Sequence, residues 1–175
     1  QAEHDEDAMC VLITTSAPLA EAVLMRVEAE TARMERKEII RASLGNNGVV
    51  VVVRDLKEAV LLTDTIAPEH LSIQTVFPRK IADQIRNAGA MMLGPMTPVA
   101  VGDYFAGPNH ILPTGRRARF ASPLTAEDFR KVTSILHYSS ERLHRDGEDI
   151  MEFARAEQLR AHARSVEVRI QPDTQ

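Results

Sequence analysis

Short apolar runs alternate with longer stretches of helical spacing along the first half of the chain. The apolar runs predict strands at residues 9–15, 49–53, 71–73 and 91–93. The stretches between them predict helices from Ser16 and Pro18 to Gly45, from Asp55 to Ala67 and from Pro78 to Gly89. The run 49–53 is five consecutive valines, which suits the middle of a covered parallel sheet. Strands that alternate with helices in this way favour a parallel α/β sheet with right-handed crossovers.

The pattern changes in the last third of the chain. Residues 125–140 predict a helix that gives way to an extended piece, and 141–168 a charged helical stretch broken near Gly147. The apolar face of this stretch is thin, so we expect it to pack on a neighbour, either the first domain or another subunit. We therefore predict an α/β domain over residues 1–122 and a C-terminal segment, mainly helical, over residues 123–175.

Composition narrows the class of protein. The chain has 175 residues, 44% of them hydrophobic, which is enough for a real core, and its formal net charge is -4. An acidic chain is a poor partner for nucleic acid, so we interpret Arg116, Arg117 and Arg119 as a solvated loop. No apolar stretch is long enough to cross a membrane. The single cysteine, Cys10, lies in an apolar run and is expected to be a buried thiol, which fits a reducing cytoplasm.

Candidate chemistry lies in two motifs. Residues 102–114, GDYFAGPNHILPT, place Asp103 and His110 among glycines and prolines, the material of a metal or proton-transfer site. A helix cap at Asp103 and a turn at His110 are the structural alternative. In APEHLSI, Glu69 and His70 follow Pro68 at the entry to a predicted strand, where an irregular backbone lets both line one pocket. Because sites in parallel sheets gather beyond the carboxyl ends of strands, we expect the chemistry there.

Together these blocks resemble the histidinol dehydrogenase family. The matching stretches are QAEH at the start, APEHL, the run from Asn87 to Thr114, ARFASPL and the spacing of Glu157 to His162, in the family's order. The resemblance implies an incomplete Rossmann-like parallel sheet with flanking helices and a C-terminal helical dimerisation tail. It also implies a zinc- and NAD-dependent four-electron oxidation of L-histidinol through L-histidinal to L-histidine. Family members are more than twice this long, so the resemblance implies that the chain is the C-terminal portion.

The resemblance also implies roles for particular residues. The zinc ligands are Gln1, His4, Asp103 and His162, and the catalytic pair is Glu69 and His70. The substrate-binding residues implied by the resemblance are Gln1, His4, His70, Asp103, His110, Glu157 and His162. The histidine of the tail is donated to the metal of the other subunit, so the implied assembly is an intertwined homodimer. No G-x-G-x-x-G follows a strand here, and no NAD contact is assigned to this segment.

Two observations keep alternatives open. On a regular helix, positions five apart, such as Glu157 and His162, lie about 140° apart and do not share a face, so spacing alone indicates a solvated helix. The sequence also departs from the family pattern at Ser72 and at residues 115–117. These departures leave open a related dehydrogenase of another polar alcohol. An inactive metal-binding or dimerisation module is the third alternative.

Overall fold

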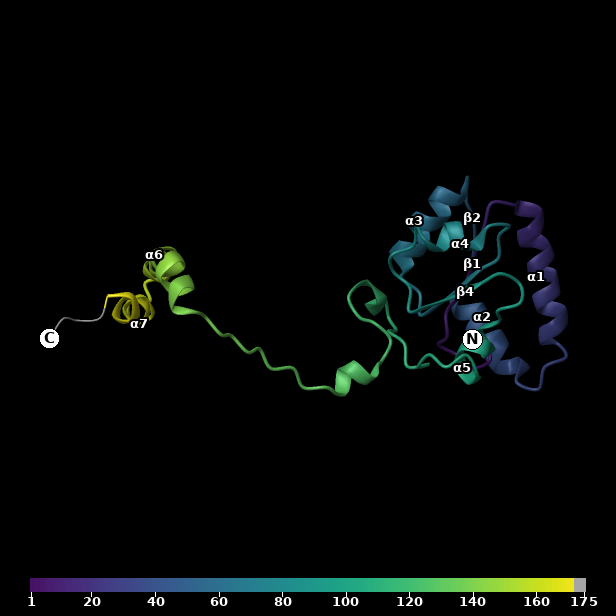
Figure 1. The fold of residues 1–175 in the computed structure, drawn as a ribbon. Helices are drawn as coiled ribbons and strands as arrows, with labels where there is room; N and C mark the ends of the chain where they lie inside the picture. The colour runs from purple at the N-terminus through teal and green to yellow at the C-terminus, as the bar shows by residue number, and fades with distance from the viewer. Residues whose placement is uncertain (172–175) are drawn as a thin grey trace. The chain divides into compact units, whose positions relative to one another are not determined.

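The chain folds into two compact units, of which the first ends at Phe129 and the second begins at Arg130. The computed structural model describes residues 1–171. The predicted boundary, between residues 122 and 123, lies slightly before the observed one, and the functions assigned to the two parts stay predictions. In Figure 1 the first unit holds the strands and the helices labelled α1 to α5.

The first unit opens with two parallel strands and two helices. Strand β1 (Cys10–Thr14) pairs with β2 (Gly48–Val52) in parallel, with Cys10 opposite Gly48. Between them lie α1 (Ala17–Thr31), which Ser16 caps by accepting the N–H of Leu19 at 3.3 Å, and α2 (Lys37–Asn47). The prediction of one helix up to Gly45 is therefore wrong. One helix of that length would extend roughly 40 Å, whereas a five-residue strand spans only about 17 Å, so two shorter helices pack on this sheet instead.

The five valines form a strand, but its surroundings differ from the prediction. Within residues 1–171 this sheet has two strands, and Val49, Val50 and Val52 are 43%, 39% and 50% exposed. Val53, just past the strand, is the buried member of the run. β-branched residues favour a strand wherever a pleated surface is half covered, so the run predicted the element and not its place in a sheet.

A second parallel pair carries the rest of the first unit. Helix α3 (Leu56–Ile66), β3 (His70–Ile73), α4 (Pro78–Ala82) and β4 (Ala90–Leu93) follow in order. Strands β3 and β4 pair in parallel, with His70 opposite Ala90. The predicted parallel strands are confirmed, although within residues 1–171 they form two separate sheets rather than one. The predicted helix to Gly89 ends early because the carboxylate of Asp64 accepts the backbone N–H groups of Arg86 and Asn87.

The remainder of the first unit is mostly irregular. It contains α5 (Val99–Tyr104) and two 3-10 turns, Arg117–Arg119 and Ala126–Phe129. Among the buried apolar side chains of the whole first unit are Ile40, Val53, Ile73, Ile85 and Met92. None of the helices described between residues 1 and 171 is long and apolar enough to cross a membrane.

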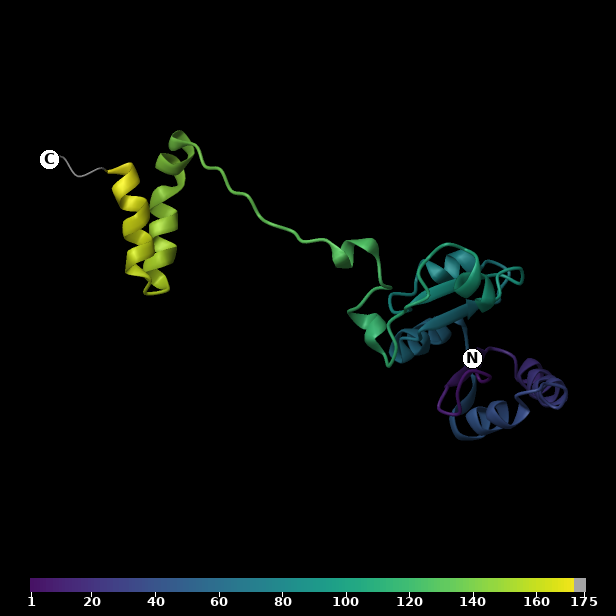
Figure 2. The ribbon, with the colours of Figure 1, turned by 90° about the horizontal axis from the view of Figure 1, so that it is seen from below.

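The second unit is a helical hairpin with an extended lead-in. Residues 130–139 contain no helix or strand, so the helix predicted from 125 is wrong apart from one 3-10 turn. Helices α6 (Ser140–Ala156) and α7 (Arg160–Ile170) lie side by side, as Figure 2 shows, and bury Met151 and Ala163.

The break expected near Gly147 is also wrong, since α6 runs through this residue. A Cβ added at Gly147 would lie 3.1 Å from Cδ1 of Ile170, so glycine at this position lets α7 approach closely. The chain reverses instead after Glu157, where Gln158 adopts a φ of 63°.

Candidate functional site

The site begins where α3 gives way to β3. Ala67 ends the helix in the left-handed conformation, with a φ of 50°, and Pro68 cannot continue it. Glu69 follows, and His70 is the first residue of β3. The side chain of His70 is 11% exposed and that of Glu69 is 37% exposed. The irregular strand entry predicted for this pair is therefore present.

Three predicted site residues lie around the His70 ring. The side-chain N–H of Gln1 donates to Nδ1 of His70 over 3.0 Å. Oε1 of Glu69 lies 3.9 Å from the same Nδ1 atom. On the other side of the ring, Oδ1 of Asp103 lies 3.4 Å from Nε2. Nε2 is buried and has no hydrogen-bond partner in the described part of the chain. Residues far apart in the sequence thus meet at one imidazole.

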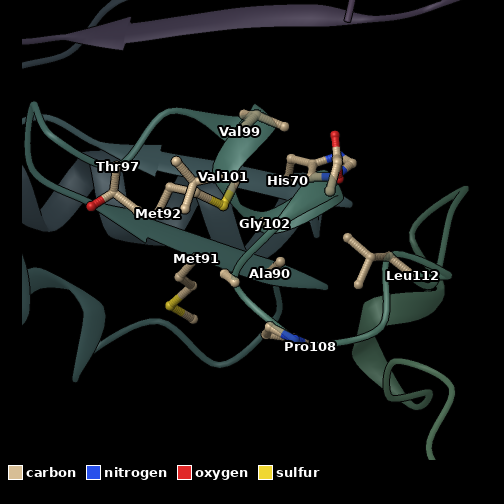
Figure 3. Close-up of a pocket in the computed structure, with 12 residues that line it drawn as sticks. His70, Ala90, Met91, Met92, Thr97, Val99, Val101, Gly102, Pro108 and Leu112 are labelled. Carbon is tan, nitrogen blue, oxygen red and sulfur yellow. The ribbon is translucent and has the colours of Figure 1, made fainter.

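A cavity of about 150 Å³ opens beside His70. Figure 3 shows His70 at one end of this space, with Met92 and Val101 along its wall. Most lining side chains are apolar, and His70 and Asp103 supply its ionisable groups. The arrangement can therefore exclude water from one side of a paired carboxylate and imidazole.

The polar end of the cavity does not lie beyond the carboxyl ends of the strands, where we expected the chemistry. His70 and Ala90, which both line the cavity, are the first residues of β3 and β4. The expectation of chemistry beyond the carboxyl ends of the strands is therefore wrong for this group. After β4, the 94–98 loop leads into α5, and Asp103 near the end of α5 comes within 3.4 Å of the first residue of β3.

The other predicted site residues do not join this cluster. His4 and His110 have exposed side chains, and neither ring forms a hydrogen bond among residues 1–171. Glu157 and His162 belong to the second unit and are also exposed. Within one copy of the chain, residues 1–171 hold no group of three or more His, Cys, Asp and Glu side chains arranged to bind a metal ion. The predicted ligand set stays a prediction.

The geometry of Glu157 and His162 differs from the regular helix assumed for them. Glu157 is the residue after α6, and His162 lies in the first turn of α7. The two residues therefore flank a chain reversal at the closed end of the hairpin. The argument from helical spacing does not apply, because no single helix contains both.

Sequence reasoning missed the residues that hold the strand entry in place. Asn87 Nδ2 donates to the carbonyl of Asp64 at 3.1 Å, and Arg116 Nη2 donates to the carbonyl of Thr65, also at 3.1 Å. Arg119 donates to the same Thr65 carbonyl. All three arginines are exposed, as a solvated loop predicts, but the guanidinium groups of Arg116 and Arg119 also donate to the protein backbone. The signal in the sequence was Pro68, which has no N–H to offer the preceding turn of a helix.

Fold and site together define an α/β protein with a paired carboxylate and imidazole beside an apolar cavity. These two groups are of the kind that transfers protons or binds metal ions. A model of the histidinol dehydrogenase family matches residues 1–170. The chain belongs to this family.

Relatives and a solved structure agree with this assignment. The chain is 49% identical over 173 residues to the histidinol dehydrogenase of Caldanaerobacter subterraneus subsp. tengcongensis, covering 99% of this chain and 40% of the relative. It is 52% identical over 170 residues to that of Nitrobacter winogradskyi, with 97% and 40% coverage. A crystal structure of histidinol dehydrogenase from Elizabethkingia anophelis matches with a TM-score of 0.91 and 30% identity, covering 97% of this chain and 39% of that one. The chain spans about 40% of the length of the curated relatives it matches.

Proposed function

We propose that this chain carries the metal and catalytic site of a histidinol dehydrogenase. The reaction is the oxidation of L-histidinol through L-histidinal to L-histidine, in which two molecules of NAD each accept a hydride. The meeting of Gln1, Glu69 and Asp103 at the ring of His70 supports this proposal more than any other observation.

The donor chemistry of the proposed ligand set fits a zinc ion. Gln1 and Asp103 offer an amide oxygen and a carboxylate oxygen, and His4 and His162 add two imidazole nitrogens, a set that suits a borderline divalent ion. When bound, zinc supplies a positive charge that holds and orients an amino alcohol through its nitrogen atoms. With one anionic ligand the set keeps a net positive charge, which favours the electron-rich amine and imidazole of histidinol.

His70 is the proposed base for the first oxidation. As the hydride leaves the alcohol carbon for NAD, the hydroxyl proton goes to the His70 ring, and the carbon becomes an aldehyde. Imidazole suits this work because its ordinary pKa lies near neutrality. Nε2 of His70 supports this role, because it is buried, forms no hydrogen bond within residues 1–171 and lies 3.4 Å from the Asp103 carboxylate.

Glu69 is the proposed base for the second oxidation. It takes a proton from water as the water oxygen bonds to the aldehyde carbon, and the second hydride then leaves that carbon for NAD. The Glu69 carboxylate is half-exposed, so water reaches it, and it lies 3.9 Å from the ring that handles the first proton. We assign His110 to substrate orientation and Glu157 to a charge-assisted hydrogen bond with the cationic amine or imidazole of the substrate.

The proposed assembly is a homodimer in which His162 of one copy completes the metal site of the other. Exposed apolar side chains of the lead-in to the hairpin support it: Val132, Ile135 and Leu136 are each at least 87% exposed. Side chains of this kind gain from burial in a partner. A reducing cytoplasm is the proposed location, because the chain has one cysteine and needs no disulfide.

The test uses a chimera in which this chain replaces the matching segment of the Caldanaerobacter subterraneus relative. The expected result is zinc bound to the purified chimera and two NADH formed for each histidinol consumed. The unmodified relative is the control for assay and folding. A folded, zinc-loaded chimera that forms no NADH from histidinol would contradict the proposed reaction, and NADH formation from another polar alcohol alone would replace the substrate.

A further inference from the structure

The carboxyl end of α3 lacks two of its ordinary hydrogen-bond donors. In a continuing helix, the carbonyl of Asp64 would accept the N–H of residue 68, but that residue is Pro68 and has none. The carbonyl of Thr65 loses its helical partner as well, because Ala67 turns the chain out of the helix in the left-handed conformation. Both carbonyls need donors from elsewhere in the chain.

Side chains from two distant segments supply these donors. Asn87 donates to Asp64, and the guanidinium groups of Arg116 and Arg119 both donate to Thr65. We call these three side chains the α3 clamp. Arg116 adopts a φ of 68°, a left-handed conformation that costs free energy for a residue with a Cβ. Two positive charges at the end of a helix also interact favourably with its dipole.

The clamp holds the backbone that leads directly to the catalytic pair. The carbonyl of Glu69 accepts the N–H of Ala90 at 2.8 Å, one residue before His70, where the pairing of β3 with β4 begins. A Cβ at Gly89 would lie 2.6 Å from this carbonyl and 3.2 Å from Cδ of Pro113. Gly89 therefore lies close to both the Glu69 carbonyl and Pro113, which belongs to the chain that connects Asp103 to Arg116.

We propose that Arg116 and Arg119 are positioning residues, which fix the Glu69–His70 backbone relative to the Asp103 segment by clamping the end of α3. The same chain segment carries Asp103, the Pro113 contact and the two arginines, so the clamp ties one side of the site to the other. The effect on catalysis rests on the proposed function, whereas the effect on the backbone does not.

Hydrogen exchange of the backbone tests the positioning directly in this chain. In a double variant, Arg116→Ala with Arg119→Ala, we expect the amides of Gly89 and Ala90, which donate to the carbonyls of Pro68 and Glu69, to exchange at least tenfold faster, because the strand entry opens without the clamp. Amides of α6 and α7 should not change.

Arg117→Ala is the matched control. Arg117 belongs to the same loop and is exposed, and its guanidinium forms no hydrogen bond or ion pair within residues 1–171. Exchange at the strand entry should stay as in the unmodified chain. Unchanged exchange in the double variant, or an equal increase in Arg117→Ala, would overturn the proposal.

The kinetic arm uses the chimera. The double alanine variant should lose at least about tenfold in kcat with less than twofold change in KM for histidinol, because a misplaced base slows chemistry more than binding. Arg116→Lys with Arg119→Lys, which keeps both charges and donors, should recover part of kcat. Equal loss of kcat in the alanine and lysine variants would contradict positioning by these hydrogen bonds. If the parent chimera forms no NADH, the proposed function fails, and the exchange measurement alone decides the clamp.

Discussion

At the scale of single residues, the site depends on how the chain enters β3. Glu69 and His70 are neighbours in sequence, and a regular strand would send their side chains to opposite faces. The helix end at Ala67 and the proline after it allow both groups to lie beside one another, with 3.9 Å between Oε1 and Nδ1. The resemblance could name these residues, and Pro68 indicated the irregular entry. Arg116 and Arg119 belong to no chemical motif, and their hydrogen bonds to the Thr65 carbonyl depend on how distant segments pack together.

The proposed division of labour between Glu69 and His70 is testable in the chimera. His70→Asn should reduce NADH formation from histidinol by about 10²- to 10⁴-fold, the usual range for loss of a general base. Glu69→Gln should spare more of this first oxidation and impair the second, because the variant leaves the alcohol base in place. Single-turnover measurements starting from histidinol and from histidinal separate the two steps.

Two results would contradict the roles proposed for Glu69 and His70. Unchanged turnover in both variants would refute the assignment, and a stronger effect of Glu69→Gln on the first step would reverse it. His144→Asn is the control, because Nδ1 of this histidine donates to the carbonyl of Ser140 on α6 and the residue has no proposed part in the reaction.

At the scale of elements, the second unit differs most from its prediction. A glycine inside a helical pattern usually indicates a weak point, yet Gly147 lies within α6 and faces α7. The residue types of this segment favour helices, so the sequence predicted them. The place where the chain reverses, between α6 and α7, depends instead on how the two helices pack. The same packing brings Glu157 and His162 to the two sides of the reversal.

Substitutions at Gly147 test this close approach. Gly147→Leu should destabilise the hairpin by about 1–3 kcal/mol, the usual cost of overpacking, because its side chain has no room beside Ile170. Gly147→Ala should be nearly neutral. The higher helix propensity of alanine stabilises α6 by about 1 kcal/mol, and the tight contact of the new Cβ with Ile170 opposes this gain. Hydrogen exchange of α6 and α7 amides gives both values. A neutral leucine variant would show that the helices do not pack at this residue.

Because of Asp146, we expect the stability of the start of α6 to depend on pH. Arg145, Tyr138 and Arg142 all donate to its carboxylate, and these hydrogen bonds hold its pKa well below the usual range. The folded pKa is lower than the unfolded one, so the stabilisation is complete above about pH 4 and is lost as the pH falls through the folded pKa.

The comparison is with Asp146→Asn. At neutral pH the amides of the first two turns of α6 should exchange faster in the variant than in the unmodified chain. The difference should shrink as the pH is lowered below about 4. A difference that persists unchanged in acid would mean that the carboxylate charge is not its source.

At the scale of the molecule, the sequence indicated parallel strands, connecting helices and a separate helical end, because periodicity and turn residues are local signals. The division into two two-stranded sheets was not predictable, since pairing depends on which surfaces remain uncovered and not on strand propensity. The predicted metal ligands divide between the two units: Gln1, His4 and Asp103 lie in the first and His162 in the second. A shared site is thus a claim about assembly.

The most direct test of that claim is zinc bound to a purified mixed dimer of the chimera, with Asp103→Ala in one copy and His162→Ala in the other. If each site takes His162 from the opposite copy, the mixed dimer keeps one intact site and should bind about one zinc ion, against about two for the unmodified dimer and none for either variant alone. Loss of zinc from the mixed dimer would contradict the account, because it would place Asp103 and His162 of each site in the same copy.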